Sequence, residues 1–420
     1  MNDRIKITES CQDSSDSSIS MSEALALIKE KITPISGFHS VALRDGLGRV
    51  LAEPIVSPMN VPAYRNSAMD GYALHGDELP TQGRAEFQVI GTAFAGKPFV
   101  RQLGPGQCVR IMTGAKMPES ADSVVIQEQV ERTGDKILVD AHNRPGQNVR
   151  QAGEDIQQGS VVLESGRRVN APQLGVLASL GIAELRVRRR PRVAFFSSGD
   201  EIRSIGEALK EGQIYDSNRY TLHGMLTNLD VDVIDLGVIP DREESITAAL
   251  QEASREADLV LTSGGVSVGE ADHVVAALRR LGSIHFSKVA IKPGRPLTFG
   301  HIGNIPFFGL PGNPVAVMTT FLQFTRPAIA QMRGECDLTL PLFELPCRSR
   351  LRKTPGRTEF QRGIMEREAD GEWVVRSSGR QGSGVLSSMS DGNCFILLPE
   401  KRGTVEPGDS VSVQPFALFY

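Results

Sequence analysis

The sequence predicts a multidomain α/β and β protein whose central domain is a mainly parallel α/β domain. Apolar strands alternate with amphipathic helices from Pro191 onward, and this alternation is typical of βαβ units around a parallel sheet. Residues 40–190 instead contain short apolar runs between Gly- and Pro-rich turns, which predict β-rich N-terminal domains. Because 420 residues exceed what one hydrophobic core usually supports, several domains are expected.

Both ends of the chain also carry clear signals. Residues 1–20 are mostly polar and are predicted to form a disordered tail, because they cannot bury enough apolar surface. Helical spacing of apolar residues predicts a helix that begins at Met21 and ends before Pro34. After about Cys336 the helical pattern stops, and residues 340–420 alternate as short strands between turns, which favours a C-terminal small β-barrel.

The order of elements in the central domain follows from the same patterns. Five apolar runs predict strands, and apolar residues at helical spacing lie between several of them. Ligands of open parallel sheets bind beyond the carboxyl ends of the strands, so the loops that follow the strands are the first places to look for a site. The predicted strands are 192–196, 231–236, 259–261, 284–291 and 305–310, and the predicted helices are 217–228, 242–257 and one that begins near His273.

Composition excludes several classes of function. The 46 basic and 50 acidic side chains give a net charge of −4, so no nucleic acid partner is expected. No run of about 18 apolar residues occurs, so no membrane anchor is expected. The five scattered cysteines lack metal or disulfide spacing, which fits the cytoplasm. The seven histidines lack metal-ligand spacing, and no serine or cysteine is paired with a recognisable base, so no nucleophilic triad is predicted.

Three Gly-rich turns follow strands that are expected to share one sheet. Such turns expose successive backbone N–H groups at a helix start, where they can form a concave site for phosphate. Any one of them could be no more than a tight turn, and none matches a P-loop or a Gly-x-Gly-x-x-Gly fingerprint. Three at one sheet edge nevertheless favour a phosphate-bearing ligand. The candidate binding residues are Ser198 and Gly199 in the first turn, Gly264, Gly265, Ser267 and Gly269 in the second, and Pro311, Gly312 and Asn313 in the third.

Carboxylates stand beside these loops. Glu201 follows the first turn, Asp241 follows the next predicted strand, and Asp272 follows the second turn. Carboxylates next to a phosphate would repel it unless a divalent cation lay between them, so the three acids predict a Mg²⁺ site. Helix capping is an equal alternative for two of them, since Asp241 precedes Glu244 in a capping-box pattern and Asp272 precedes a predicted helix.

Basic side chains provide a candidate clamp for an oxyanion. Lys288 and Lys292 are four residues apart on one predicted strand, and side chains alternate along a strand, so both should point to one face. Arg295 follows in a loop that two prolines stiffen, and a guanidinium adds a fork of donors. A single lysine on a strand is usually only solvated, but this group beside a Gly-rich sheet edge favours phosphate or oxyanion binding.

Seven short segments carry a more specific pattern: 66–73, 113–115, 153–155, 198–201, 262–269, 292–294 and 310–314. The first reads Asn-Ser-Ala-Met-Asp-Gly-Tyr-Ala, and the last reads Leu-Pro-Gly-Asn-Pro. In this order they resemble the motifs of the molybdopterin molybdenumtransferase (MoeA) family, whose animal counterpart is the gephyrin E domain. Each motif alone is weak, but so many in sequence are highly specific, and the resemblance covers about residues 20–420.

The resemblance implies a homodimer, active sites shared between subunits, and a particular reaction. Family members bind adenylylated molybdopterin, release AMP in a Mg²⁺-dependent step and join molybdate to the dithiolene sulfurs. A separate adenylyltransferase is a candidate partner protein. The implied domains are a linking domain from 21–57 and 152–190, a β-rich domain at 58–151, a molybdopterin-binding α/β domain at 191–336 and the C-terminal β-barrel at 337–420.

The resemblance also implies roles for particular residues. The functional acids are Asp70, Asp155, Glu201, Asp241 and Asp272, their basic partners are Lys288 and Lys292, and the barrel contributes Arg362 and Ser383. The chain departs from the usual family pattern at Arg65, Lys116 and Arg295. Arginine in place of lysine at the last position is conservative in charge only.

Two other classes of function are weighed against this interpretation. A non-catalytic scaffold of the gephyrin type is the main alternative, but five functional acids and two lysines would be superfluous in a scaffold. A nucleotide-dependent oxidoreductase would need a Gly-x-Gly-x-x-Gly turn after a strand, and the sequence has none.

Overall fold

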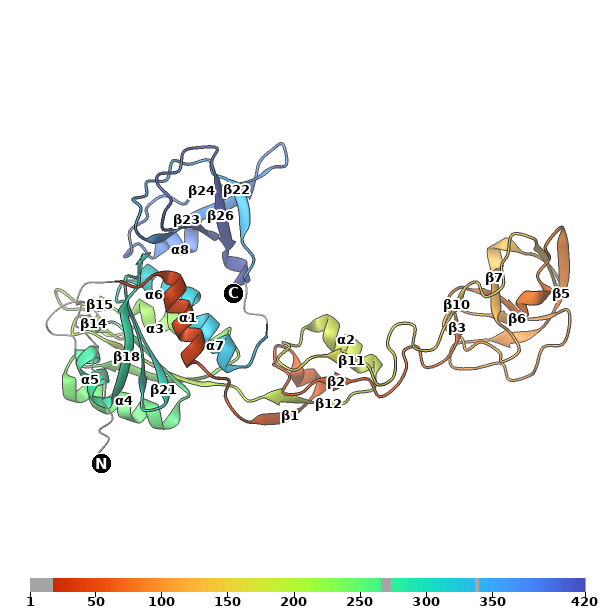
Figure 1. Ribbon diagram of the computed structural model, residues 1–420, viewed down its shortest axis with the longest axis horizontal. Coiled ribbons are helices and arrows are strands. Elements are labelled where there is room, and N and C mark those ends of the chain that lie inside the picture. Colours follow the sequence, from red (N-terminus) through yellow and green to blue (C-terminus); the bar gives the residue numbers. More distant parts are fainter. Residues whose placement is uncertain (1–17, 266–272, 337–339, 420) are drawn as a thin grey trace, which may run out of the picture. The chain divides into compact units, whose positions relative to one another are not determined.

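The computed structural model describes residues 18–265, 273–336 and 340–419. The chain divides into two compact units, one of Ser40–Val187 and one that combines Met1–His39 with Arg188–Tyr420 (Figure 1). Each unit has its own sheets and its own clusters of buried apolar side chains, as expected of separate domains.

The second unit is built around a six-stranded sheet with the order β16-β13-β17-β21-β20-β18. Its first four strands are parallel, and β20 and β18 are antiparallel at one edge. The prediction of a mainly parallel α/β domain is therefore confirmed. The strands are β13 (Arg192–Ser198), β16 (Asp232–Ile239), β17 (Leu259–Ser263), β18 (Gly282–Lys288), β20 (Pro296–Ile302) and β21 (Ile305–Leu310).

Helices cover both faces of this sheet, because its central strands carry apolar side chains on both faces. On β13, Val193 and Phe195 belong to one buried cluster, and Ala194 and Phe196 belong to another. The first cluster packs against α1, α3, α6 and α7, and the second against α4 and α5 (Figure 1). Every helix in the described parts of the chain is too short or too polar to cross a lipid bilayer. The helices are α1 (Met21–Lys31), α3 (Ser217–Thr227), α4 (Glu243–Glu256), α5 (His273–Leu281), α6 (Pro314–Thr320) and α7 (Arg326–Met332).

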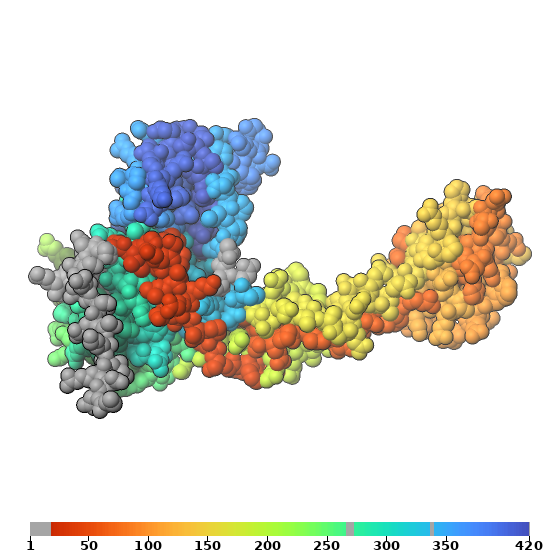
Figure 2. Space-filling view, in the orientation of Figure 1, coloured from red at the N-terminus to blue at the C-terminus, as the bar shows by residue number. Residues whose placement is uncertain are grey.

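The N-terminal segment joins the fold earlier than the sequence predicts. The Ile19 N–H donates to the Lys288 carbonyl at 3.1 Å. Ser20 caps α1 in a reciprocal capping box with Glu23, and Figure 2 shows this helix in red on the surface of its unit. The predicted disorder is therefore wrong for the last residues of the tail, and residues 1–17 lie outside the described residues.

The predicted strand 284–291 extends too far toward the C-terminus. β18 ends at Lys288, and the next strand, β19 (Ile291–Lys292), belongs to the C-terminal sheet, where it lies parallel to β23. The chain changes sheet because the backbone beyond Lys288 pairs with the N-terminal segment instead. Lys288 and Lys292 therefore do not share one face of one strand.

The C-terminal part forms a sheet with the order β19-β23-β25-β26-β22, and β24 pairs with β23. Cys347, directly after β22, bridges to Val375 in β24, so the sheet closes into the predicted small β-barrel. The expectation of no helix after Cys336 is wrong, because Met389 of a short helix, α8, packs into the core beside the barrel. The elements are β22 (Phe343–Pro346), β23 (Thr358–Arg367), β24 (Trp373–Ser377), α8 (Ser387–Asp391), β25 (Cys394–Leu398) and β26 (Ser410–Pro415).

The unit Ser40–Val187 is rich in β structure, as predicted. Its largest sheet has the order β7-β4-β6-β5-β9-β8, in which β5 and β6 are parallel and the other pairs antiparallel. Two-stranded sheets β1-β12, β3-β10 and β2-β11 and the helix α2 complete it. The finer division into a linking domain and a β-rich domain stays a prediction. The elements are β1 (Phe38–Ala42), β2 (Ile55–Val56), β3 (Asn66–Ser67), β4 (Gly71–Leu74), β5 (Arg84–Ala93), β6 (Gln107–Ile111), β7 (Ser123–Ile126), β8 (Glu131–Thr133), β9 (Lys136–Asp140), β10 (Val149–Arg150), β11 (Val161–Leu163), α2 (Ala171–Ser179) and β12 (Glu184–Arg188).

Two histidines at the antiparallel edge of the central sheet form a pH-sensitive contact. His285 Nε2 and His301 Nδ1 lie 2.9 Å apart, so one ring donates and the other must keep an unprotonated nitrogen. Burial lowers the pKa of both imidazoles, and the charge of His285 lowers the pKa of His301 further. The neutral pair is therefore favoured in the folded protein.

The free energy of unfolding is expected to decrease as the pH falls below about 6.5, because unfolded histidines take up protons there while the folded pair does so only at lower pH. Urea unfolding at several pH values measures this dependence. His301→Gln should flatten it, and the matched change at the exposed His142 should not. The same pH dependence in all three proteins would contradict the assignment.

Candidate active site

The carboxyl ends of β13, β17 and β21 meet at a cavity of about 530 Å³. Residues from all three predicted turns line it together with two of the predicted acids. This is the site that the topology of an open parallel sheet favours. The predicted residues in its wall are Ser198, Gly199, Glu201, Asp241, Gly264, Gly265, Pro311, Gly312 and Asn313.

Glycine is required where the turns approach one another. Gly264 has a φ of +86°, and a Cβ at this position would lie 2.4 Å from the backbone oxygen of Ser198. A Cβ at Gly199 would lie 2.7 Å from a carboxylate oxygen of Glu201. A side chain at Gly264 would push the turns that contain Ser198 and Gly264 apart, so glycine permits their close approach, whereas the flexible Glu201 side chain could move away from a Cβ at Gly199.

Asp241 does not cap the helix that follows it. The N-cap of α4 is Arg242, which makes no side-chain capping bond. The Ser198 hydroxyl donates to Asp241 Oδ1 at 3.2 Å, and Asp241 lines the cavity. The capping interpretation of Asp241 is therefore wrong, and its carboxylate is oriented by the first Gly-rich turn.

Glu201 and Asp241 are the described carboxylates of the predicted metal set. The Glu201 carbonyl accepts the Ile214 N–H at 2.9 Å, beside a short parallel pair, β14 (Ile202–Arg203) and β15 (Ile214–Tyr215). Two carboxylates in one cavity supply the oxygen ligands that Mg²⁺ prefers. The third predicted acid, Asp272, and the predicted binding residues Ser267 and Gly269 lie outside the described residues.

A second cavity of about 250 Å³ brings Lys292 and Arg362 together. Lys292 Nζ lies 3.3 Å from a carboxylate oxygen of Glu359. Arg362 is 1% exposed and donates to the Ser388 hydroxyl at 3.0 Å and to the backbone oxygens of Arg380 and Gly382. Burial lowers the pKa of Arg362 to about 10. A buried guanidinium therefore forms part of this wall, with only neutral oxygens as partners among the described residues.

The remaining predicted basic and barrel residues do not line this second cavity. Arg295 Nε donates to the Ser18 hydroxyl at 3.1 Å, in a separate surface depression. The Ser383 carbonyl accepts the Val315 N–H at 3.1 Å and so links the barrel to α6. The structure thus groups Lys292 with Arg362 and does not group it with Lys288 or Arg295.

Asp70 and Asp155 belong to the unit Ser40–Val187. One Asp70 oxygen accepts both the N–H and the hydroxyl of Thr113 at 2.7 Å each, and these bonds hold the pKa of Asp70 below its usual range. Asp155 is exposed, and its N–H donates to the Val61 carbonyl at 3.0 Å. Asp70 is half-buried and Asp155 is exposed, each is held by contacts within its own unit, and their roles stay predictions.

Several residues in the wall of the first cavity were not predicted from the sequence, among them Tyr215, Asp216 and Asn218. They do not follow a strand of the main sheet, and the search for ligand-binding loops at the carboxyl ends of the strands therefore does not select them. A local signal was present, because Asp directly before a predicted helix is a common N-cap, and Asp216 does cap α3.

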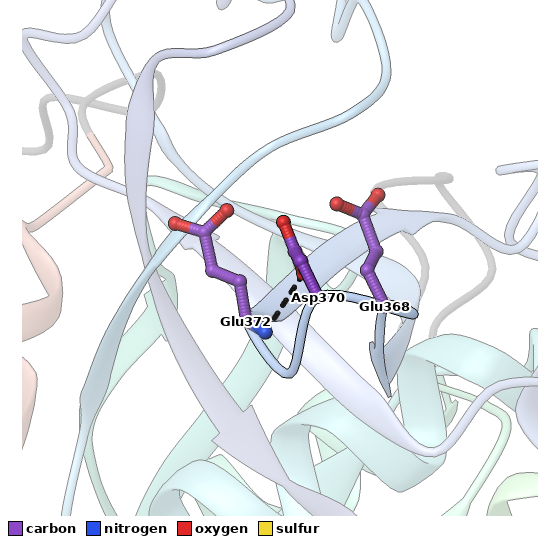
Figure 3. Close-up of side chains that lie close together, drawn as sticks. All are labelled: Glu368, Asp370 and Glu372. Atoms are coloured by element: carbon purple, nitrogen blue, oxygen red, sulfur yellow. Dashed lines mark hydrogen bonds between the residues drawn. The ribbon is translucent and has the colours of Figure 1, made fainter.

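A third group of carboxylates lies on the exposed turn between β23 and β24 (Figure 3). Glu368, Asp370 and Glu372 could offer ligand atoms within 4.8 Å of one another. Arg348 forms ion pairs with Glu368 at 2.6 Å and with Glu372 at 3.0 Å, and the Glu372 N–H donates to Asp370. The ion pairs with Arg348 and the geometry of the turn explain why these three carboxylates lie close together.

Comparison with known families gives consistent matches along the chain. The MoeA N-terminal region (domain I and II) matches residues 19–181, a probable molybdopterin binding domain matches 194–331, and the MoeA C-terminal region (domain IV) matches 344–416.

Individual proteins match over most of their length. The molybdopterin molybdenumtransferase of Haemophilus influenzae is 44% identical over 89% of this chain and 93% of its own. The gephyrin of Dictyostelium discoideum is 32% identical over 93% of this chain, which spans 61% of that protein. A crystal structure of the molybdopterin biosynthesis moeA protein from Pyrococcus horikoshii OT3 superimposes with a TM-score of 0.84, at 30% identity, over 95% of this chain and all of that one. The chain therefore belongs to the molybdopterin molybdenumtransferase family, a family of transferases of molybdenum cofactor biosynthesis.

Proposed function

We propose that this chain joins molybdate to molybdopterin in a Mg²⁺-dependent reaction that consumes adenylylated molybdopterin and releases AMP. The observation that carries the proposal is the cavity at the ends of β13, β17 and β21. Residues of three Gly-rich turns meet there with two of the predicted carboxylates, Glu201 and Asp241. Such turns and carboxylates together suit a phosphate-bearing substrate when a cation lies between the carboxylates and the phosphate.

The donor set fits Mg²⁺, which prefers carboxylate oxygens and keeps several waters. Glu201 and Asp241 would hold it, with Asp272 as the third acid expected from the sequence, and the bound cation would neutralise charge on the phosphate that leaves with AMP. The Ser198 hydroxyl keeps Asp241 turned toward the cavity. The Gly-rich turns would orient the phosphate through their N–H groups.

The second cavity supports an oxyanion subsite for molybdate. A buried guanidinium is costly unless an anion compensates it, and Arg362 forms no ion pair with a described residue. Lys292 adds a second positive charge to the same wall, although Glu359 offsets part of it. An oxyanion would find donors from both cations there.

Lys292→Ala is expected to weaken molybdate binding by about tenfold or more, because it removes a charged donor. The loss should be larger at low ionic strength, where exposed charges are least screened. Calorimetric titration with molybdate measures it, and Lys97→Ala, at an exposed position in the other unit, is the control. Equal affinity in Lys292→Ala and wild type would remove Lys292 from the subsite.

The chain is further proposed to act in the cytoplasm as a homodimer whose active sites are shared between subunits, with an adenylyltransferase as a candidate partner protein. A non-catalytic scaffold of the gephyrin type would bind molybdopterin without converting it. Turnover separates these alternatives.

The test is a reconstitution with the purified protein, adenylylated molybdopterin, Mg²⁺ and molybdate. AMP release and molybdenum incorporation should rise together, and omission of Mg²⁺ should stop both. Binding of the substrate without AMP release under these conditions would favour the scaffold.

A further inference from the structure

Two residues in the wall of the first cavity keep a buried acceptor oxygen without a partner. Asp216 is 3% exposed and Asn218 is 7% exposed. Neither Asp216 Oδ2 nor Asn218 Oδ1 accepts a hydrogen bond from any residue that the structure describes. Buried polar atoms are almost always paired, so a ligand of this cavity is expected to supply the missing donors.

The other polar atom of each side chain already forms hydrogen bonds within the protein. Asp216 Oδ1 accepts the Arg219 N–H at 3.0 Å and so caps α3. Asn218 Nδ2 donates to the Ser263 hydroxyl and to the Gly312 carbonyl, both at 2.8 Å. A carbonyl oxygen can only accept, so the contact with Gly312 fixes the orientation of the amide and leaves Asn218 Oδ1 as an acceptor.

The same segment adds an aromatic ring to the cavity wall. Tyr215 is 45% exposed, and its hydroxyl donates to the Glu207 carbonyl at 2.8 Å, which holds the side chain in place. Ile202 and Ile214, paired in β14 and β15, line the cavity beside it. Apolar and aromatic surface next to acceptor atoms suits a flat ring that carries N–H donors at its edge.

We infer that Asp216 and Asn218 form a subsite that accepts hydrogen bonds from the amino group of an amino-substituted heteroaromatic ring, with Tyr215 as part of its wall. The inference rests on the proposed function and deepens it, because adenylylated molybdopterin carries two amino-substituted rings, a pterin and an adenine. Both rings offer N–H donors of the kind that the two oxygens lack.

Two pairs of ligands test the subsite in the wild-type protein by calorimetric titration. AMP is compared with inosine monophosphate, and pterin with lumazine, since each pair exchanges an amino group for an oxo group. A preference of at least about tenfold for the amino compound is expected in one pair, because a site built to accept from an amino group rejects an analogue that carries an oxo group in its place. A preference for AMP assigns the subsite to adenine, and a preference for pterin assigns it to the pterin. No preference in either pair overturns the inference.

Asp216→Asn tests the residue itself. Asparagine caps a helix about as well as aspartate, so α3 should keep its cap, while an amide NH₂ takes the place of Oδ2. The preference for the amino compound should disappear or reverse. Asn170→Asp makes the opposite exchange at the N-cap of α2 and should change nothing.

The two proposals fail in different ways. If Asp216→Asn folds, as thermal unfolding would show, and keeps the full preference, the subsite is wrong. If the variant does not fold, the wild-type ligand pairs still decide. Loss of the proposed function would instead appear as wild-type protein that releases no AMP from the complete substrate, whatever its preference between rings.

Discussion

Glu201→Gln and Asp241→Asn are each expected to lower Mg²⁺-dependent AMP release by at least about a hundredfold, with little change in stability. A neutral amide cannot supply the negative charge that holds a cation beside a phosphate. Since Asp241 is not the cap of α4, its replacement should not destabilise that helix. Initial rates of AMP release at saturating Mg²⁺, together with thermal unfolding, measure both effects.

Asp200→Asn is the matched control. This exposed aspartate lies in the same turn as Glu201 but does not line the cavity, so its variant should keep wild-type rates. Wild-type turnover in Glu201→Gln or Asp241→Asn would remove that residue from the metal site.

Mixing two inactive variants is expected to restore about a quarter of the wild-type activity, if each active site uses Asp70 of one copy and Glu201 of the other. After random exchange of Asp70→Asn and Glu201→Gln subunits, about half of the dimers are mixed. A mixed dimer has one site with both lesions and one with neither. The specific activity is measured before and after exchange.

Mass spectrometry of differently tagged subunits shows whether exchange is complete. A fully exchanged mixture that stays inactive would mean that both residues act in the same subunit. Each variant alone, taken through the same exchange procedure, must stay inactive.

The strand ends of the central sheet were predictable because their signals are local. Continuous apolar runs that stop at Gly-rich turns give both the strands and the edge where ligands bind, and the structure brings Ser198, Gly264 and Gly312 to one cavity there. The metal interpretation of Asp241 could not be separated from capping by sequence, because both place an acid before a helix. The structure excludes capping, because the N-cap of α4 is Arg242, and the metal role of Asp241 stays a prediction.

The basic clamp was predicted less well because it depends on partners far along the chain. Lys288 and Lys292 lie in one apolar run, yet the backbone between them pairs with the N-terminal segment and with the barrel. The structure places Lys292 in one cavity wall with Arg362, which lies 70 residues further on, in β23. Periodicity within a run carries no information about such long-range pairing.

A crystal structure of the Glu201→Gln variant with adenylylated molybdopterin tests the central claim most directly, since the slow variant should retain the substrate. We expect phosphate density against the backbone N–H groups of the turns that contain Gly199, Gly264 and Gly312. Ordered substrate elsewhere on the chain, with this cavity open to solvent, would contradict it.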